Sequence, residues 1–303
     1  MTAPQPGVVH TYARNHTLFE FSTKPNEPAP NVLLFMSGLT NGLLDVPYLP
    51  LLAEKLKDLT GERWALAHVL LSSAYIGWGT SSLEKDAFEI SLAVKYLRSE
   101  TGGSRQKIVL QGHSTGCQDV MQYLTKKSQE SGFDPVCSVS AGILQAPVSD
   151  SEAIRGNKTF IDTLTAEADT YIESGKAKEI LPEKFRKAAF NTPITAYRFN
   201  SLFKRHGDDD YFSTYLTDDD LKLSFGILSK PVLVLYGEKD EFVPESVDKA
   251  ALVAKWKETT PSEFWSPLSK VLKGAVHDVG EGSDEGAMED LVQTVVEFIK
   301  TIN

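Results

Sequence analysis

The chain has 303 residues, of which 41% are hydrophobic and 24% are charged, as in an ordinary globular protein. It carries 31 basic and 41 acidic residues, which gives a net charge of −10. We therefore expect neither nucleic acid nor an anionic membrane surface as a partner, because both bind to basic faces.

Apolar runs of strand length alternate with helical patterns along most of the chain. Strands are predicted at residues 8–13, 17–22, 31–36, 64–71, 107–111, 139–146, 231–236 and 269–273. Amphipathic helices are predicted at residues 49–59, 83–97, 117–128, 247–256 and 288–299. This alternation predicts an α/β fold, with a mostly parallel sheet that helices cover on both faces.

The alternation is interrupted between residues 151 and 226, which read as helices and loops. Residues 161–172 have apolar side chains at helical spacing in this segment. We predict a core made of residues 1–150 and 227–303, with residues 151–226 as a helical cap. An insertion between two strand–helix units would lie over the carboxyl edge of the sheet, where ligands bind in open α/β folds.

The strongest local signal is Gly112-His113-Ser114-Thr115-Gly116, which matches the G-x-S-x-G pattern of a nucleophile elbow. A predicted strand leads into it and a predicted helix leads out of it. The turn must be tight to expose the serine hydroxyl, and side chains at the two glycine positions would collide. We predict Ser114 as a nucleophile in an α/β-hydrolase fold.

The acid and base of a triad follow the serine in this fold, in that order. Asp240 is predicted as the acid because it comes just after the strand at 231–236, with Asp150 as the main rival and Glu238 and Glu241 as weaker ones. His277 is predicted as the base, since it lies between the last strand and the last helix. The other five histidines come too early, within a strand, in the insertion or, for His113, at a position expected to point away from the nucleophile.

Two backbone N–H groups are predicted to form an oxyanion hole. One is that of Thr115, which follows the nucleophile, and the other is that of Leu39, with Thr40 as the alternative. Thr40 and Asp150 are also candidates for substrate contact. Tyr75 and Trp78, in a loop after a strand, either line the pocket or cover the core.

The remaining features favour structural interpretations. The acidic runs at 208–210 and 218–220 are interpreted as structural, the second as the first turn of a helix capped by Thr217. No cluster has metal-ligand spacing and no phosphate loop is present, so neither a metal nor another cofactor is expected. Two cysteines, no secretory signal and no membrane-spanning run predict a cytoplasmic protein that is not membrane-bound.

Several segments resemble a fungal and plant α/β-hydrolase family of unknown-function domains. They are Val109-Leu110-Gln111-Gly112-His113-Ser114-Thr115-Gly116-Cys117-Gln118-Asp119, Gly77-Trp78-Gly79-Thr80-Ser81-Ser82-Leu83, Gln145-Ala146-Pro147-Val148-Ser149-Asp150 and Asp208-Asp209-Asp210-Tyr211-Phe212-Ser213. The resemblance runs nearly end to end. The family includes fungal esterases that open ester bonds of fusarinine-type siderophores inside the cell, so the resemblance implies this chemistry.

The sequence thus predicts a serine esterase that cleaves a small-molecule carboxylic ester through an acyl-enzyme. Siderophore esters are the leading substrate hypothesis. Two alternatives stay open at this point. The same fold and triad serve acyltransferases, and some proteins with this fold bind ligands without catalysis.

Overall fold

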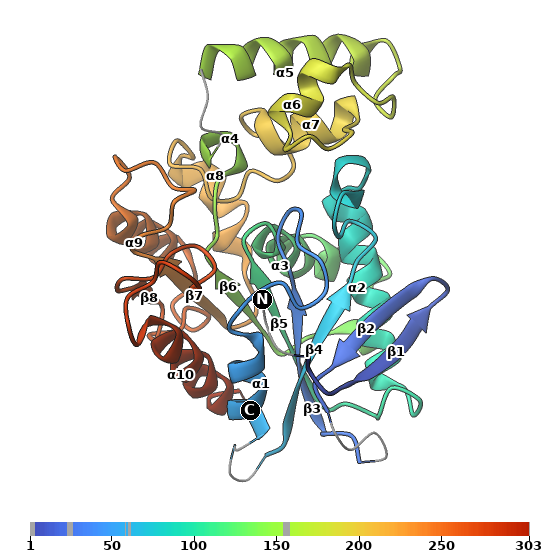
Figure 1. Cartoon of the computed structure of the whole chain (residues 1–303), viewed down its shortest axis with the longest axis vertical. Coiled ribbons are helices and arrows are strands. Elements are labelled where there is room, and N and C mark those ends of the chain that lie inside the picture. The colour runs from blue at the N-terminus through green and yellow to red at the C-terminus, as the bar shows by residue number, and fades with distance from the viewer. Residues whose placement is uncertain (1–3, 23–26, 58, 60–61, 154–157, 303) are drawn as a thin grey trace.

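The computed structural model describes residues 4–22, 27–57, 59, 62–153 and 158–302 (Figure 1). Within these residues an eight-stranded sheet has the order β1-β2-β4-β3-β5-β6-β7-β8. The strands are β1 (Val8–Ala13), β2 (His16–Glu20), β3 (Asn31–Met36), β4 (Trp64–Leu70), β5 (Lys107–His113), β6 (Ala141–Gln145), β7 (Val232–Gly237) and β8 (Lys270–Leu272). β4, β3 and β5 to β8 are parallel, whereas β1 and β2 form an antiparallel edge. The mostly parallel sheet predicted from the sequence is confirmed.

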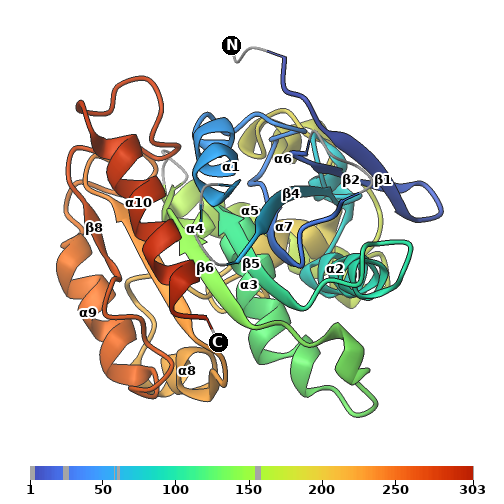
Figure 2. The ribbon, with the colours of Figure 1, turned by 90° about the horizontal axis from the view of Figure 1, so that it is seen from below.

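The central strands are largely apolar because both of their faces are covered. Every residue of β3 and of β7 is buried. On one face lie α1 (Leu49–Lys57) and α10 (Ala287–Lys300) (Figure 2). On the other lie α2 (Leu83–Arg98), α3 (Gly116–Thr125) and α9 (Lys249–Thr259). The five predicted helices of the core are therefore confirmed.

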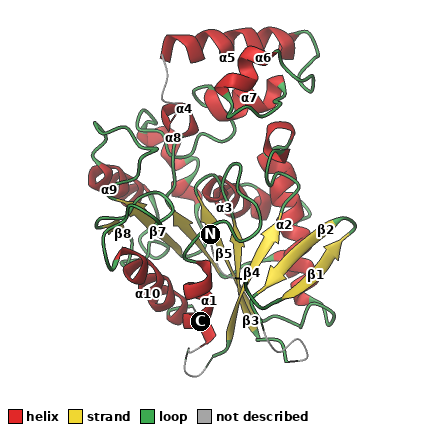
Figure 3. Cartoon of the chain, in the orientation of Figure 1, coloured by secondary structure: helices red, strands yellow, loops and turns green. Residues whose placement is uncertain are grey.

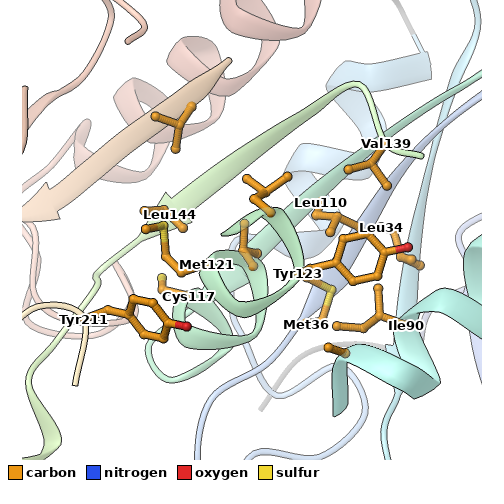
Figure 4. Close-up of a cluster of buried hydrophobic side chains, with 14 of the residues drawn as sticks. Leu34, Met36, Ile90, Leu110, Cys117, Met121, Tyr123, Val139, Leu144 and Tyr211 are labelled. Carbon is orange, nitrogen blue, oxygen red and sulfur yellow. The ribbon is translucent and has the colours of Figure 1, made fainter. Parts of the chain in front are cut away.

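The face under α2 and α3 shows how the strands and helices interlock. Figure 4 shows Leu34 and Leu110 from neighbouring strands against Ile90 of α2 and Tyr123 of α3. The Tyr123 hydroxyl donates a hydrogen bond to the carbonyl of Cys137 at 2.7 Å, so its polar end is satisfied inside the core. This packing fixes the position of α3, which begins two residues after Ser114.

The helices between β6 and β7 separate into two groups. Their bounds are α4 (Asp150–Ala153), α5 (Lys158–Glu173), α6 (Glu183–Ala188), α7 (Ala196–Phe203) and α8 (Asp218–Lys222). α5 to α7 form an apolar cluster of their own with Trp78, beyond one end of the sheet (Figures 1 and 3). α8 instead packs beside α9, and the Phe225 ring that follows it stacks on Trp256 at 5.4 Å.

The two acidic runs of this region are structural, as predicted. Thr217 caps α8, and its N–H and hydroxyl donate to Asp220 while its hydroxyl accepts the N–H of Asp220. In the first run, Asp209 is buried and pairs with Arg198 of α7 at 2.6 Å. Across the described ranges, no helix has the length and apolar character needed to cross a membrane.

Candidate active site

The turn that carries Ser114 is built around two glycines. β5 leads into it and α3 leads away, and Ser114 itself has a left-handed backbone with φ of 55°. A Cβ atom on Gly112 would lie 2.1 Å from the carbonyl oxygen of Gly116, and one on Gly116 would lie 2.5 Å from that of Met36. Only glycine fits at either position. α3 consequently begins at Gly116, two residues after the serine, and the N–H groups of its first turn favour negative charge there.

Asp240 and His277 meet although they follow different strands. Asp240 comes after β7 and His277 after β8, and the two strands are parallel neighbours. Oδ2 of Asp240 lies 2.8 Å from Nδ1 of His277, and both side chains are buried. Oδ1 of Asp240 accepts the N–H of Phe242 at 3.0 Å. Both carboxylate oxygens are thus engaged, one by the imidazole and one by the turn that follows.

The neighbouring carboxylates bind the backbone of the His277 segment. Glu241 Oε2 accepts the backbone N–H of His277 at 3.0 Å. Glu238 Oε2 accepts the N–H of Gly274 at 2.7 Å, at the start of the same turn. The three carboxylates of residues 238–241 therefore bind residues 274–277 at separate points.

Asp150, the main rival for the acid, has a different partner. Its Oδ2 accepts a hydrogen bond from Nε2 of Gln118 at 2.7 Å. Burial, followed by the charge of Asp209, raises the pKa of the Asp150 carboxyl well above its usual range. A raised pKa favours the neutral form of the carboxyl group, and that form stabilises an imidazolium less than a carboxylate does.

A cavity of about 220 Å³ is lined by six of the nine predicted site residues, Asp240 not among them. Ser114 and His277 line it together with Leu39, Thr40, Thr115 and Asp150. The remainder of its wall mixes apolar side chains with polar ones, among them Glu241 and Asp278, and comes in part from the helical segment between β6 and β7, through Phe190 and Phe203. The cavity therefore lies between the carboxyl end of the sheet and that segment.

The loop after β3 presses directly against the nucleophile. A Cβ atom on Gly38 would lie 2.6 Å from Cβ of Ser114. The loop then turns through Thr40, which has φ of 66°, while the N–H of Asn41 donates to the carbonyl of Gly38 at 3.2 Å. This close approach brings the backbone of Leu39 to the same cavity as that of Thr115.

Tyr75 and Trp78 lie outside the lining of this cavity. Trp78 is buried in the apolar cluster of α5 to α7. Tyr75 is half exposed, and its hydroxyl accepts the N–H of Leu43 at 3.3 Å. Of the four residues predicted to contact substrate, the structure brings Thr40 and Asp150 to the cavity.

His113 does not point away from the site, contrary to the expectation from the sequence. Its ring lies 4.9 Å from the ring of His277, and it lines the same cavity. The turn at Ser114 changes the direction of the chain, so strand alternation alone could not give the orientation of His113. Burial, together with the charge of His277, lowers the pKa of His113 to about 3, so its ring is neutral at pH 7.

Two further residues at the site were not predicted. The Phe242 ring lies 4.6 Å from the His277 ring and covers one side of the cavity. Gln145, at the end of β6, contacts both His113 and the His277 backbone. A polar residue at the carboxyl end of a buried apolar strand was the available signal for Gln145.

Comparisons with known proteins identify the family of this chain. Residues 1–300 match the family described as "Protein of unknown function (DUF1749)". A UPF0613 protein of Schizosaccharomyces pombe is 35% identical, with 99% of each chain covered. The "Fusarinine C esterase sidJ" of Aspergillus fumigatus is 30% identical, with 98% of this chain and 96% of the relative covered.

A solved structure extends the similarity to three dimensions. The "Siderophore hydrolase EstB" of Aspergillus fumigatus superposes with a TM-score of 0.81 at 29% identity, covering 99% of this chain and 98% of that one. The chain therefore has an α/β-hydrolase fold, and it belongs to the DUF1749 family.

Proposed function

We propose that this protein is a serine esterase that cleaves carboxylic esters through an acyl-enzyme, with Ser114 as nucleophile, His277 as base and Asp240 as acid. The observation that carries the proposal is the 2.8 Å contact between His277 Nδ1 and Asp240 Oδ2 beside a cavity that Ser114 also lines. A carboxylate accepts hydrogen bonds only, so the imidazole proton is on Nδ1. The Nε2 lone pair of His277 is then available to take a proton from the nucleophile.

The reaction proceeds in two steps. His277 Nε2 takes the hydroxyl proton of Ser114 as Oγ attacks the ester carbonyl, and Asp240 stabilises the resulting imidazolium. The negative oxygen of the tetrahedral intermediate receives hydrogen bonds from the N–H groups of Leu39 and Thr115. The intermediate then expels the alcohol, which takes the proton from His277. Water next attacks the acyl-enzyme by the same route, releasing the carboxylic acid and restoring the serine.

The helices between β6 and β7 act as a cap in this proposal. Phe190 and Phe203 reach the cavity from this segment, so it contributes apolar contacts to the bound ester. An apolar wall also limits the access of water to the oxyanion hole, and this strengthens the hydrogen bonds there. We assign residues 151–226 to the insertion that carries this cap, with α5 to α7 as the cap itself and α8 packed beside α9, and the remainder of the chain to the catalytic core.

Siderophore esters are the substrate class that we propose. The support is similarity to two Aspergillus fumigatus proteins, one named as a fusarinine C esterase and the other as a siderophore hydrolase. A cytoplasmic location is part of the same proposal. Both cysteines, Cys117 and Cys137, are unpaired and buried, as is usual for a protein of a reducing compartment.

The proposal is tested by incubating the purified protein with fusarinine C and with simple aryl esters, and following the products by mass spectrometry. We expect each cleaved ester to gain the mass of one water, and no cleavage by Ser114→Ala. Cleavage of aryl esters alone would remove the siderophore assignment. Transfer of the acyl group to an added alcohol in preference to water would favour an acyltransferase instead.

A further inference from the structure

Gln145 contacts both the turn that carries Ser114 and the segment that carries His277. It is the last residue of that strand and pairs with His113 of β5 in the sheet register. Its side chain is fully buried. Nε2 of Gln145 donates to the carbonyl of His277 at 3.0 Å, and Oε1 lies 2.5 Å from Nδ1 of His113. One amide group therefore bridges the two histidines of the site.

The direction of each hydrogen bond around this amide follows from its partners. The His277 carbonyl can only accept, so the NH₂ group of Gln145 faces it and the amide oxygen faces the other way. That oxygen also accepts the hydroxyl of Tyr48 at 3.1 Å. Because an amide oxygen cannot donate, the proton of the neutral His113 ring must be on Nδ1. The structure thus specifies one tautomer for His113.

The backbone of Gln145 completes the connection to the nucleophile. Its carbonyl accepts the N–H of Ser114 at 3.0 Å and the thiol of Cys117 at 3.2 Å. The backbone of Gln145 thus binds the backbone of Ser114, and the side chain of Gln145 binds the backbone of His277.

We propose that Gln145 is a positioning residue for the reaction: it fixes the His277 segment relative to the Ser114 turn and holds His113 as its Nδ1–H tautomer. The inference rests on the proposed function, because it concerns the geometry of that triad. A displacement of about 1 Å between reacting groups lowers a rate by about 100-fold.

The neutral state of His113 matters to the same step. Its ring lies 4.9 Å from that of His277, which must become positively charged during acyl transfer. A second positive charge at that distance would oppose this protonation. Burial keeps His113 neutral, and Gln145 fixes where its one proton is placed.

Gln111 offers a matched control within the same network. It is also fully buried, it lies on the adjacent strand β5, and its Nε2 donates to the Tyr48 hydroxyl at 3.3 Å. The two glutamines therefore flank one tyrosine. Replacing either with methionine removes a buried amide of similar size, but only the Gln145 variant loses the hydrogen bonds to His113 and to the His277 carbonyl.

The test compares the kcat and KM of Gln145→Met and Gln111→Met on a short chromogenic ester. We expect kcat of Gln145→Met to fall by about 100-fold with little change in KM, because the amide acts on the base and not on the bound ester. Gln111→Met should keep a kcat close to that of the wild type. Equal losses in the two variants would overturn the inference. Activity that survives Ser114→Ala would instead overturn the proposed function.

A second measurement uses the wild-type protein and so does not depend on how a variant folds. Long-range ¹⁵N–¹H correlation spectra distinguish the two tautomers of a neutral histidine ring. At pH 7 we expect His113 to carry its proton on Nδ1, and we expect this preference to be lost in Gln145→Met but kept in Gln111→Met. A proton on Nε2 of His113 in the wild type would overturn the inference.

Discussion

Replacing Asp240 with asparagine tests how the acid orients the base. The wild-type carboxylate accepts two hydrogen bonds, from Phe242 N–H through Oδ1 and from His277 Nδ1–H through Oδ2. The introduced asparagine has one oxygen, and the Phe242 N–H needs an acceptor. The amide oxygen therefore stays on Phe242, and the NH₂ group faces the imidazole.

This arrangement forces the wrong tautomer on the base. His277 Nδ1 must accept from the new NH₂ group, so the ring proton moves to Nε2 and the ring can no longer take the proton of Ser114. A triad with this tautomer loses about 10⁴-fold in kcat, equivalent to about 5 kcal/mol of transition-state stabilisation. Because the substitution is isosteric, the melting temperature should change little.

The assay is hydrolysis of a short chromogenic ester, with Asp150→Asn as the matched control. Asp150 lines the same cavity, but its carboxyl group accepts a hydrogen bond from Gln118 Nε2. The amide oxygen of the introduced asparagine can accept the same hydrogen bond. We expect Asp150→Asn to keep most of the wild-type kcat. A loss below about tenfold for Asp240→Asn, or an equal loss for Asp150→Asn, would refute the assignment of the acid.

Three other perturbations probe the loop, the core and the cap. Gly38→Ala should lower kcat/KM by about 100-fold, because its Cβ would lie 2.6 Å from Cβ of Ser114. Gly226→Ala should leave kcat/KM unchanged, because its Cβ would lie 3.5 Å from Cβ of Lys222, an ordinary contact distance. Burial raises the pKa of Asp86 to about 7, so the folded state keeps a proton that the unfolded chain has lost above about pH 4. The free energy of unfolding should therefore fall as pH rises from about 4 to about 7. A urea midpoint that falls equally over this range in Asp86→Asn would contradict this reasoning. Phe190→Ala should raise KM for bulky esters with little change in kcat, as steady-state kinetics would detect.

The sequence predicted the sheet well because its central strands are short apolar runs that are buried on both faces. β3 and β7 could be read in this way from their residues alone. The elbow was also readable, since the spacing of Gly112 and Gly116 around Ser114 reflects the contacts that a Cβ would make at either position.

Long-range hydrogen bonds were the part that the sequence could not supply. Gln145 and His113 are separated by 32 residues, and Gln145 and His277 by 132. Such partners depend on strand order and register, which no local pattern encodes. The sequence offered Glu241 only as a rival acid and did not predict its hydrogen bond to the His277 backbone. That hydrogen bond forms because β7 and β8 are neighbours in the sheet.

Covalent labelling tests the central claim, that Ser114 is activated by His277, most directly. A fluorophosphonate probe reacts with a serine whose proton a neighbouring base removes. We predict that the probe labels the wild-type protein on Ser114 and that labelling disappears in both Ser114→Ala and His277→Ala. A folded wild-type protein that is not labelled, or labelling that persists in either variant, would contradict the account.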